Sequence, residues 1–196
     1  MKRIMRLNEP LEGRKLGDSL WMLNWLYQNG INDVHIMCQA GHHDTLHLGA
    51  FDEMLDLYKD KLSVTVETQE YIAESDFPSN MLVKPMILCE TELPAQHIPN
   101  KPYFTYQLVS TSVGKHLTRD ARNLGYSTDG GIDIFDNSYS LPELFSLIKH
   151  AKYHMTVDSG PAFAAVSVET PVKFIEAGCW KVTRDYIGEI GQVEYI

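Results

Sequence analysis

The sequence has few cysteines, few positive charges and no long apolar run, and each shortage excludes a class of protein. Its cysteines are widely spaced and form no CxxC pair, which argues against a disulfide framework and predicts reduced thiols (Cys38, Cys89, Cys179). No apolar segment approaches the roughly 20 residues of a membrane span. The basic start of the chain lacks the apolar core of a signal peptide. We therefore expect a cytoplasmic protein without a membrane span.

Acidic residues outnumber basic ones by 26 to 17, which gives a formal net charge of −9. This balance disfavours a broad electrostatic surface for nucleic acid. A local basic stretch does occur, at Lys101, Lys115, Arg119 and Arg122. The length of 196 residues and the hydrophobic content of 44% suit one globular domain or two small ones.

Hydrophobic periodicity predicts alternating strands and helices in both halves of the chain. In the first half we expect strands at 1–7, 33–39 and 62–67 and helices at 18–28 and 51–59, an order typical of a parallel α/β sheet. Five of the nine prolines then fall between positions 78 and 102, which indicates a linker. A second α/β series begins at 103. The predicted division is an N-terminal lobe at 1–92, a linker at 93–102 and a C-terminal lobe at 103–196.

Two helices are expected in the second lobe before its most informative turn. A short one, of one or two turns, is predicted at 117–124. A longer one follows Ser140, because Ser140 and Glu143 have the spacing of a capping box.

A strand-to-helix turn at Asp158-Ser159-Gly160 is the most informative motif. The β-branched residues before Asp158 predict a strand, and Pro161 suits the first position of a helix. Ser159 is a suitable helix cap, and Gly160 lets a ligand approach the backbone closely. The free N–H groups and dipole of such a helix start attract phosphate. An ordinary α/β turn would have the same local pattern.

The order of motifs around this turn resembles the carboxyl-terminal half of a known enzyme family. A "SLPEL" helix start, the "TVDSGP" turn, an alanine-rich helix and a "TPV" strand follow one another between positions 140 and 178. This stretch resembles the ADP-heptose:lipopolysaccharide heptosyltransferase-like enzymes, glycosyltransferase family 9. The resemblance implies a shortened GT-B-like fold, in which two Rossmann-like lobes with parallel sheets enclose a cleft. It also implies that the turn at 158–160 holds the diphosphate of a nucleotide-sugar.

The resemblance assigns further residues to the site. Gly17 and Asp18 match a Gly-Asp pair at the start of the first helix, where the Asp is the proposed general base; capping that helix is the alternative role of Asp18. Ser110, Thr111 and Lys115 match hydroxyl groups and a lysine that face the donor phosphates, although the same residues would suit a solvated loop. Asp18, Ser110 and Asp158 all follow predicted strands, where open α/β sheets bind ligands.

Other polar residues have a less defined place. His42 and His43 belong to a His-rich loop that also contains Asp44 and His47, but its spacing fits no zinc pattern, so we expect no metal. In the family these loops face the acceptor. Glu176 ends a predicted strand and could contact the nucleotide. Enzymes of this type need no cofactor or divalent metal.

The sequence therefore predicts an inverting glycosyltransferase that moves a sugar from a nucleotide-diphosphate sugar to an acceptor hydroxyl. The resemblance favours a glycan or lipopolysaccharide sugar as acceptor. Small size and the local basic stretch leave open a hydroxylated base in DNA, as in virus-encoded DNA glycosyltransferases. The alternative from another class is a non-catalytic nucleotide-binding or nucleotide-sugar-binding protein of the same fold. Homodimerisation is one way to stabilise such small lobes.

Overall fold

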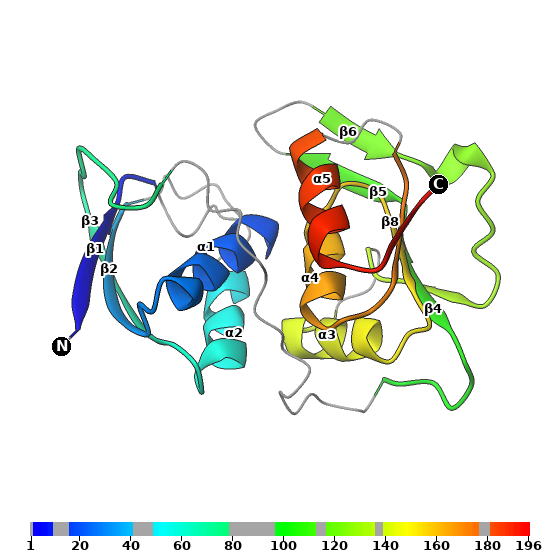
Figure 1. Cartoon of the computed structure of the whole chain (residues 1–196), viewed down its shortest axis with the longest axis horizontal. Coiled ribbons are helices and arrows are strands. Elements are labelled where there is room, and N and C mark those ends of the chain that lie inside the picture. Colours follow the sequence, from blue (N-terminus) through cyan, green and yellow to red (C-terminus); the bar gives the residue numbers. More distant parts are fainter. Residues whose placement is uncertain are drawn as a thin grey trace. The chain divides into compact units, whose positions relative to one another are not determined.

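The computed structural model describes residues 2–9, 16–40, 49–78, 97–112, 117–135, 139–176 and 181–196. The chain divides into two compact units, Met1–Met86 (unit 1) and Ile87–Ile196 (unit 2). Each unit contains its own parallel sheet, and the helices and strands are coloured along the chain in Figure 1. The prediction of a mixed α/β protein with parallel sheets is confirmed.

Unit 1 follows the predicted β-α-β-α-β order. Its strands β1 (Arg3–Leu7), β2 (Asp33–Gln39) and β3 (Ser63–Gln69) pair in parallel in the order β1-β2-β3. Helices α1 (Leu16–Gln28) and α2 (Gly49–Tyr58) connect them and lie on one face of the sheet (Figure 1). Right-handed crossovers require this one-sided arrangement when successive strands are added in one direction.

The alternation of side chains along β1 and β2 determines which face is buried. Met5, Leu7, Ile36 and Cys38 are buried together with apolar residues of the two helices, such as Leu23. The intervening residues point to the opposite face, where Ile4 is 64% exposed. Period-two alternation thus gives unit 1 one face covered by helices and one that no helix of the described residues covers, although parallel sheets are usually covered on both.

The outer edge of β1 is occupied at Arg6. The backbone N–H of Arg6 donates to Asp76 Oδ2 at 2.7 Å, and the backbone N–H of Asp76 donates to the carbonyl of Arg6 at 2.8 Å. The two side chains also form an ion pair at 2.9 Å. Hydrogen bonds from Arg6 lower the pKa of Asp76. This contact blocks the free hydrogen-bonding groups through which an edge strand could pair with another chain.

Unit 2 has a five-stranded sheet, all parallel, in the order β10-β9-β8-β4-β7. Its strands are β4 (Phe104–Gln107), β7 (Gly131–Asp133), β8 (His154–Thr156), β9 (Val172–Phe174) and β10 (Val193–Tyr195). Numbered by their order along the chain, the five strands are arranged 2-1-3-4-5. This is the flavodoxin-like order of doubly wound folds. The second strand is added on one side of the first and the later strands on its other side, so the direction of strand addition reverses between the first and third strands. Here that reversal lies between β4 and β8.

Helices α3 (Leu141–Lys149), α4 (Gly160–Ser167) and α5 (Lys181–Ile190) lie on one face of this sheet (Figure 1). The predicted capping box begins α3, because Ser140 donates to Glu143 Oε2 through its backbone N–H at 2.9 Å and through its hydroxyl at 2.8 Å. His97 Nε2 lies 2.9 Å from Oε1 of the same carboxylate. The start of α3 is thus linked to residues from before β4.

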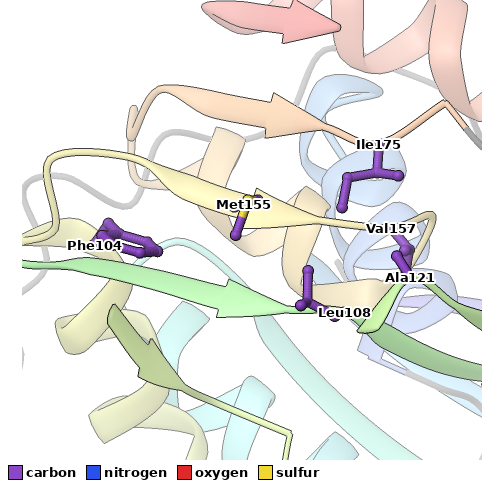
Figure 2. Close-up of a cluster of buried hydrophobic side chains, with 6 residues drawn as sticks. All are labelled: Phe104, Leu108, Ala121, Met155, Val157 and Ile175. Atoms are coloured by element: carbon purple, nitrogen blue, oxygen red, sulfur yellow. The ribbon is translucent and has the colours of Figure 1, made fainter. Parts of the chain in front are cut away.

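The opposite face of the sheet carries a separate apolar cluster. Figure 2 shows its six buried side chains, which come from β4, β8, the residues that follow these strands and β9, and the segment after β6 (Phe104, Leu108, Ala121, Met155, Val157, Ile175). Tyr106, Tyr126, Tyr153 and Ile196 pack against it. In a regular doubly wound fold a helix between the first two strands would cover this face. Here the chain between β4 and β7 covers it without an α-helix among its described residues.

The structure of the connection between β4 and β7 differs from two predictions. The segment after β4 is not a polar loop followed by a short helix at 117–124. Instead β5 (Val109–Ser112) and β6 (Leu117–Asp120) pair antiparallel, and only Arg122–Leu124 forms a single 3₁₀ turn. The segment forms a strand because β5 pairs with the backbone N–H and C=O groups of β6, which a helix would otherwise have to satisfy internally.

Candidate functional site

The carboxyl edge of the unit 2 sheet brings two of the predicted site segments together. Asp158 follows β8, and Val109 and Ser110 follow β4, the adjacent strand. The backbone N–H of Val157 donates to the carbonyl of Gln107 at 3.2 Å, so these two strands remain paired until just before the turn. The segments then separate, one into α4 and the other into the β5–β6 ribbon. This is the topological switch point, where ligands of doubly wound sheets bind.

The turn at 158–160 has the predicted strand-turn-helix form, but the role of Ser159 differs. Ser159 occupies the N-cap position of α4, but its side chain accepts no hydrogen bond from a backbone N–H of the helix. Its hydroxyl instead forms a 2.9 Å hydrogen bond with the hydroxyl of Thr156. Ser159 therefore has the predicted N-cap position, but the predicted cap hydrogen bond is replaced by a bond to the strand residue Thr156.

Exposure differs along the turn. Asp158 and Ser159 are buried, at 9% and 6% exposure, whereas Gly160 and Pro161 are partly exposed. Pro161 has no N–H, and the N–H of Ala162 donates to the carbonyl of Ser159 at 3.2 Å. The first turn of α4 therefore offers an anion fewer N–H groups than an ordinary helix start. Gly160 provides the accessible backbone.

The hydroxyl residues after β4 lie on the antiparallel ribbon. Ser110 is half-buried and pairs with Arg119, and Thr111 pairs with Thr118. Gln107, buried at the end of β4, donates from its side-chain amide to the carbonyl of Val109 at 2.9 Å and so fixes where the ribbon begins. The structure thus places Ser110 beside the switch point on a strand, where sequence reasoning expected a loop.

Several predicted residues fall elsewhere or outside the described part of the chain. Gly17 is buried in the first turn of α1, and Asp18 is the third helical residue there, so it is not the N-cap. The Asp18 side chain lies outside the described part of the structure, as do Lys115, His42 and His43 altogether. No group of three metal-ligating side chains occurs among the described residues.

Glu176 lies at the same edge as the turn but already has a partner. Arg184 of α5 forms an ion pair with it, Nε to Oε1, at 2.6 Å, and both side chains are 45% exposed. Sequence reasoning proposed Glu176 as a nucleotide contact and gave Arg184 no role. No local motif points to Arg184, because its place depends on how α5 packs against α4 and Tyr195 of β10.

The described helices include none that is long and apolar enough to cross a bilayer. Comparison of the chain with protein-family models, with curated proteins and with solved structures found no match. The resemblance to heptosyltransferase-like enzymes therefore remains a prediction that depends on the motifs between 140 and 178.

Proposed function

We propose that unit 2 binds the diphosphate of a nucleotide-sugar at the carboxyl ends of β4 and β8, and that the chain transfers the sugar to an acceptor hydroxyl with inversion. One observation carries the binding part of this proposal. The only reversal of strand order in the described sheet, between β4 and β8, coincides with the Asp158–Gly160 turn that opens α4. The sugar-transfer part depends on the family resemblance, as does its GT-B-like architecture.

Each residue of the proposed site has a chemical role. The partly exposed backbone at Gly160 would approach the phosphates, with the α4 dipole favouring their charge. Ser110, and with it Thr111 and Lys115, would bind the departing diphosphate, for which hydroxyl and ammonium groups are suitable donors. Asp18 in unit 1 would accept the proton of the acceptor hydroxyl as it attacks the anomeric carbon. The buried hydroxyl of Ser159 is bonded to the hydroxyl of Thr156 and would not touch the ligand.

A non-catalytic nucleotide-binding protein is the second candidate. It is favoured by one observation: the described turn, switch point and ribbon all belong to unit 2, so nucleotide binding does not require the base in unit 1. Both candidates predict stabilisation by a nucleoside diphosphate through mass action. Only the enzyme releases nucleoside diphosphate from a nucleotide-sugar.

The test is a thermal-shift panel of UDP-, ADP-, GDP- and CMP-sugars, followed by an assay for released nucleotide with glycan and DNA acceptors. Gly160→Val should abolish the shift, because its side chain blocks approach to the backbone. Ser159→Ala is the matched control next to it and should keep the shift. The unliganded melting temperature of each variant separates lost binding from lost folding. A normal shift in Gly160→Val would place the ligand elsewhere.

A further inference from the structure

Arg184 is held in a fixed position at the carboxyl edge of the unit 2 sheet. Its Nε lies 2.6 Å from Glu176 Oε1, and its Cζ lies 4.8 Å from the centre of the Tyr195 ring. The Tyr195 hydroxyl donates to the backbone carbonyl of Arg184 at 2.8 Å. A carboxylate and a ring face thus contact the Arg184 side chain, and the hydrogen bond from the ring's hydroxyl holds the ring to the backbone of the same residue.

Gly188 makes this arrangement possible. It lies one helical turn after Arg184, and a Cβ atom there would come too close to the Tyr195 hydroxyl oxygen. Any larger residue would displace the ring that supports the guanidinium. The support is therefore built from α5 and β10 together.

Strand register places this guanidinium next to the proposed phosphate turn. Thr156 of β8 pairs with Phe174 of β9, and Asp158 and Glu176 each lie two residues further along. The N–H of Ile175 donates to the carbonyl of Thr156 at 2.9 Å, so the strands are still joined just before both residues. Adjacent strands are about 5 Å apart, and α4 and α5 pack side by side (Figure 1). Arg184, paired to Glu176, is therefore a neighbour of the Asp158–Gly160 turn.

A diphosphate bound at this edge of the sheet would require a positively charged partner. The first turn of α4 has lost donors to Pro161 and to the Ala162 hydrogen bond. A diphosphate bound there needs compensating positive charge. When a guanidinium is paired through Nε, its two Nη groups form a separate edge whose spacing matches two phosphate oxygens. With 45% of its side chain exposed, Arg184 can present that edge to a ligand.

We infer that Arg184 is a phosphate-binding residue of the nucleotide site, oriented by Glu176 and Tyr195. This inference rests on the proposed function and names a ligand contact that the motif resemblance does not supply. It also changes the role of Glu176, which positions the arginine and does not itself contact the nucleotide.

The test measures affinity for the nucleoside diphosphate that most stabilises the wild-type protein, chosen from UDP, ADP, GDP and CDP. Arg184→Gln should raise the Kd about 10- to 100-fold, as expected for the loss of charge-assisted hydrogen bonds. Arg184→Lys keeps a cation beside Glu176 but lacks the planar pair of Nη groups, so it should bind at least about threefold more weakly than the wild type.

Lys173→Gln is the matched control. Lys173 also lies over a tyrosine ring, 4.9 Å from the centre of Tyr153, and pairs with Glu194 at 3.2 Å, but it belongs to the opposite face, which no described helix covers. This variant should leave the Kd within about twofold of the wild-type value. An equal loss of affinity in both variants would mean a general charge effect and would overturn the inference.

The outcomes separate this inference from the proposed function. If Gly160→Val abolishes binding and Arg184→Gln leaves the Kd within about twofold of the wild-type value, the arginine assignment alone is overturned. If no nucleoside diphosphate binds the wild-type protein, both are overturned. Should Arg184→Gln fail to fold, Arg184→Lys decides, and wild-type affinity in that variant would refute a role in binding.

Discussion

The rings of Phe104 and Tyr153 are stacked, with centroids 4.8 Å apart and planes inclined by 13°. They lie on the face of the unit 2 sheet that no helix of the described chain covers. The ammonium group of Lys173 lies over the Tyr153 ring and forms an ion pair with Glu194. On the other side the Phe104 ring extends over Gly131. A row of neighbouring residues thus runs across this face from β10 to β7, with Tyr153 just before β8 at its centre.

Gly131→Ala should destabilise unit 2. A Cβ atom at this position would come within 2.6 Å of the Cε2 and Cζ atoms of Phe104 and within 2.8 Å of Tyr106 Cδ1. Because Phe104 is also stacked on Tyr153, its ring has little room to move. We expect a loss of about 1–3 kcal/mol, the usual cost of overpacking, measured by urea denaturation.

A second variant tests the cause of that loss. In a Phe104→Leu background the clash with the Phe104 ring is relieved and the one with Tyr106 remains, so adding Gly131→Ala should cost less than it does in the wild type. This coupling is what a double-mutant cycle measures for residues in contact. An equal cost in both backgrounds would mean that the Phe104 ring is not the cause of the loss.

Acid should destabilise the protein through His154. Complete burial lowers the pKa of this side chain from 6.5 to about 3, although its hydrogen bond with Thr105 opposes the shift. The unfolded chain therefore takes up the proton at a higher pH than the folded chain. The stability conferred by the neutral imidazole is present above about pH 6.5 and is lost progressively as the pH falls toward 3.

His154→Gln isolates this effect, because glutamine can still bond to Thr105 but does not titrate. Between pH 6.5 and pH 5 the wild type should lose about 1.5 kcal/mol more than the variant, measured by chemical denaturation at each pH. Parallel pH profiles of the two proteins would show that His154 is protonated in the folded state or that water reaches it.

Asp18→Asn should retain nucleotide binding and lose turnover by about two to four orders of magnitude, the usual contribution of a general base. The measurements are the thermal shift with nucleotide and the rate of nucleotide release with acceptor. Asp60→Asn, in the exposed turn after α2, is the control and should leave both unchanged. Normal turnover in Asp18→Asn would exclude this residue as the base.

Local signals in the sequence account for the parts of the fold that were predicted. The Ser140–Glu143 spacing marked the start of α3, and the β-branched run before Asp158 marked β8, because caps and alternation act within a few residues. The charged segment 117–120 gave no such signal. It forms a strand only because β5 pairs with it, and that partner cannot be recognised from its own Ser-Thr-Ser composition.

The candidate site shows the same limit. The turn at 158–160 could be located from sequence, because proline and glycine have positional preferences there. The direction of the Ser159 hydroxyl and the position of Arg184 could not. Both depend on tertiary neighbours, Thr156 for the serine and Glu176 with Tyr195 for the arginine.

The reversal of strand order in unit 2 also affects how this unit folds. Thr105 and His154, paired across β4 and β8, are 49 residues apart, whereas His35 and Thr65 in unit 1 are 30 apart. Closing a longer loop costs more chain entropy before any contact compensates for it, and such topologies fold more slowly. β4 gains its second neighbour, β8, only after β5, β6, β7 and α3 have followed it along the chain. The edge proposed to bind nucleotide is therefore expected to be among the last parts of the chain to form.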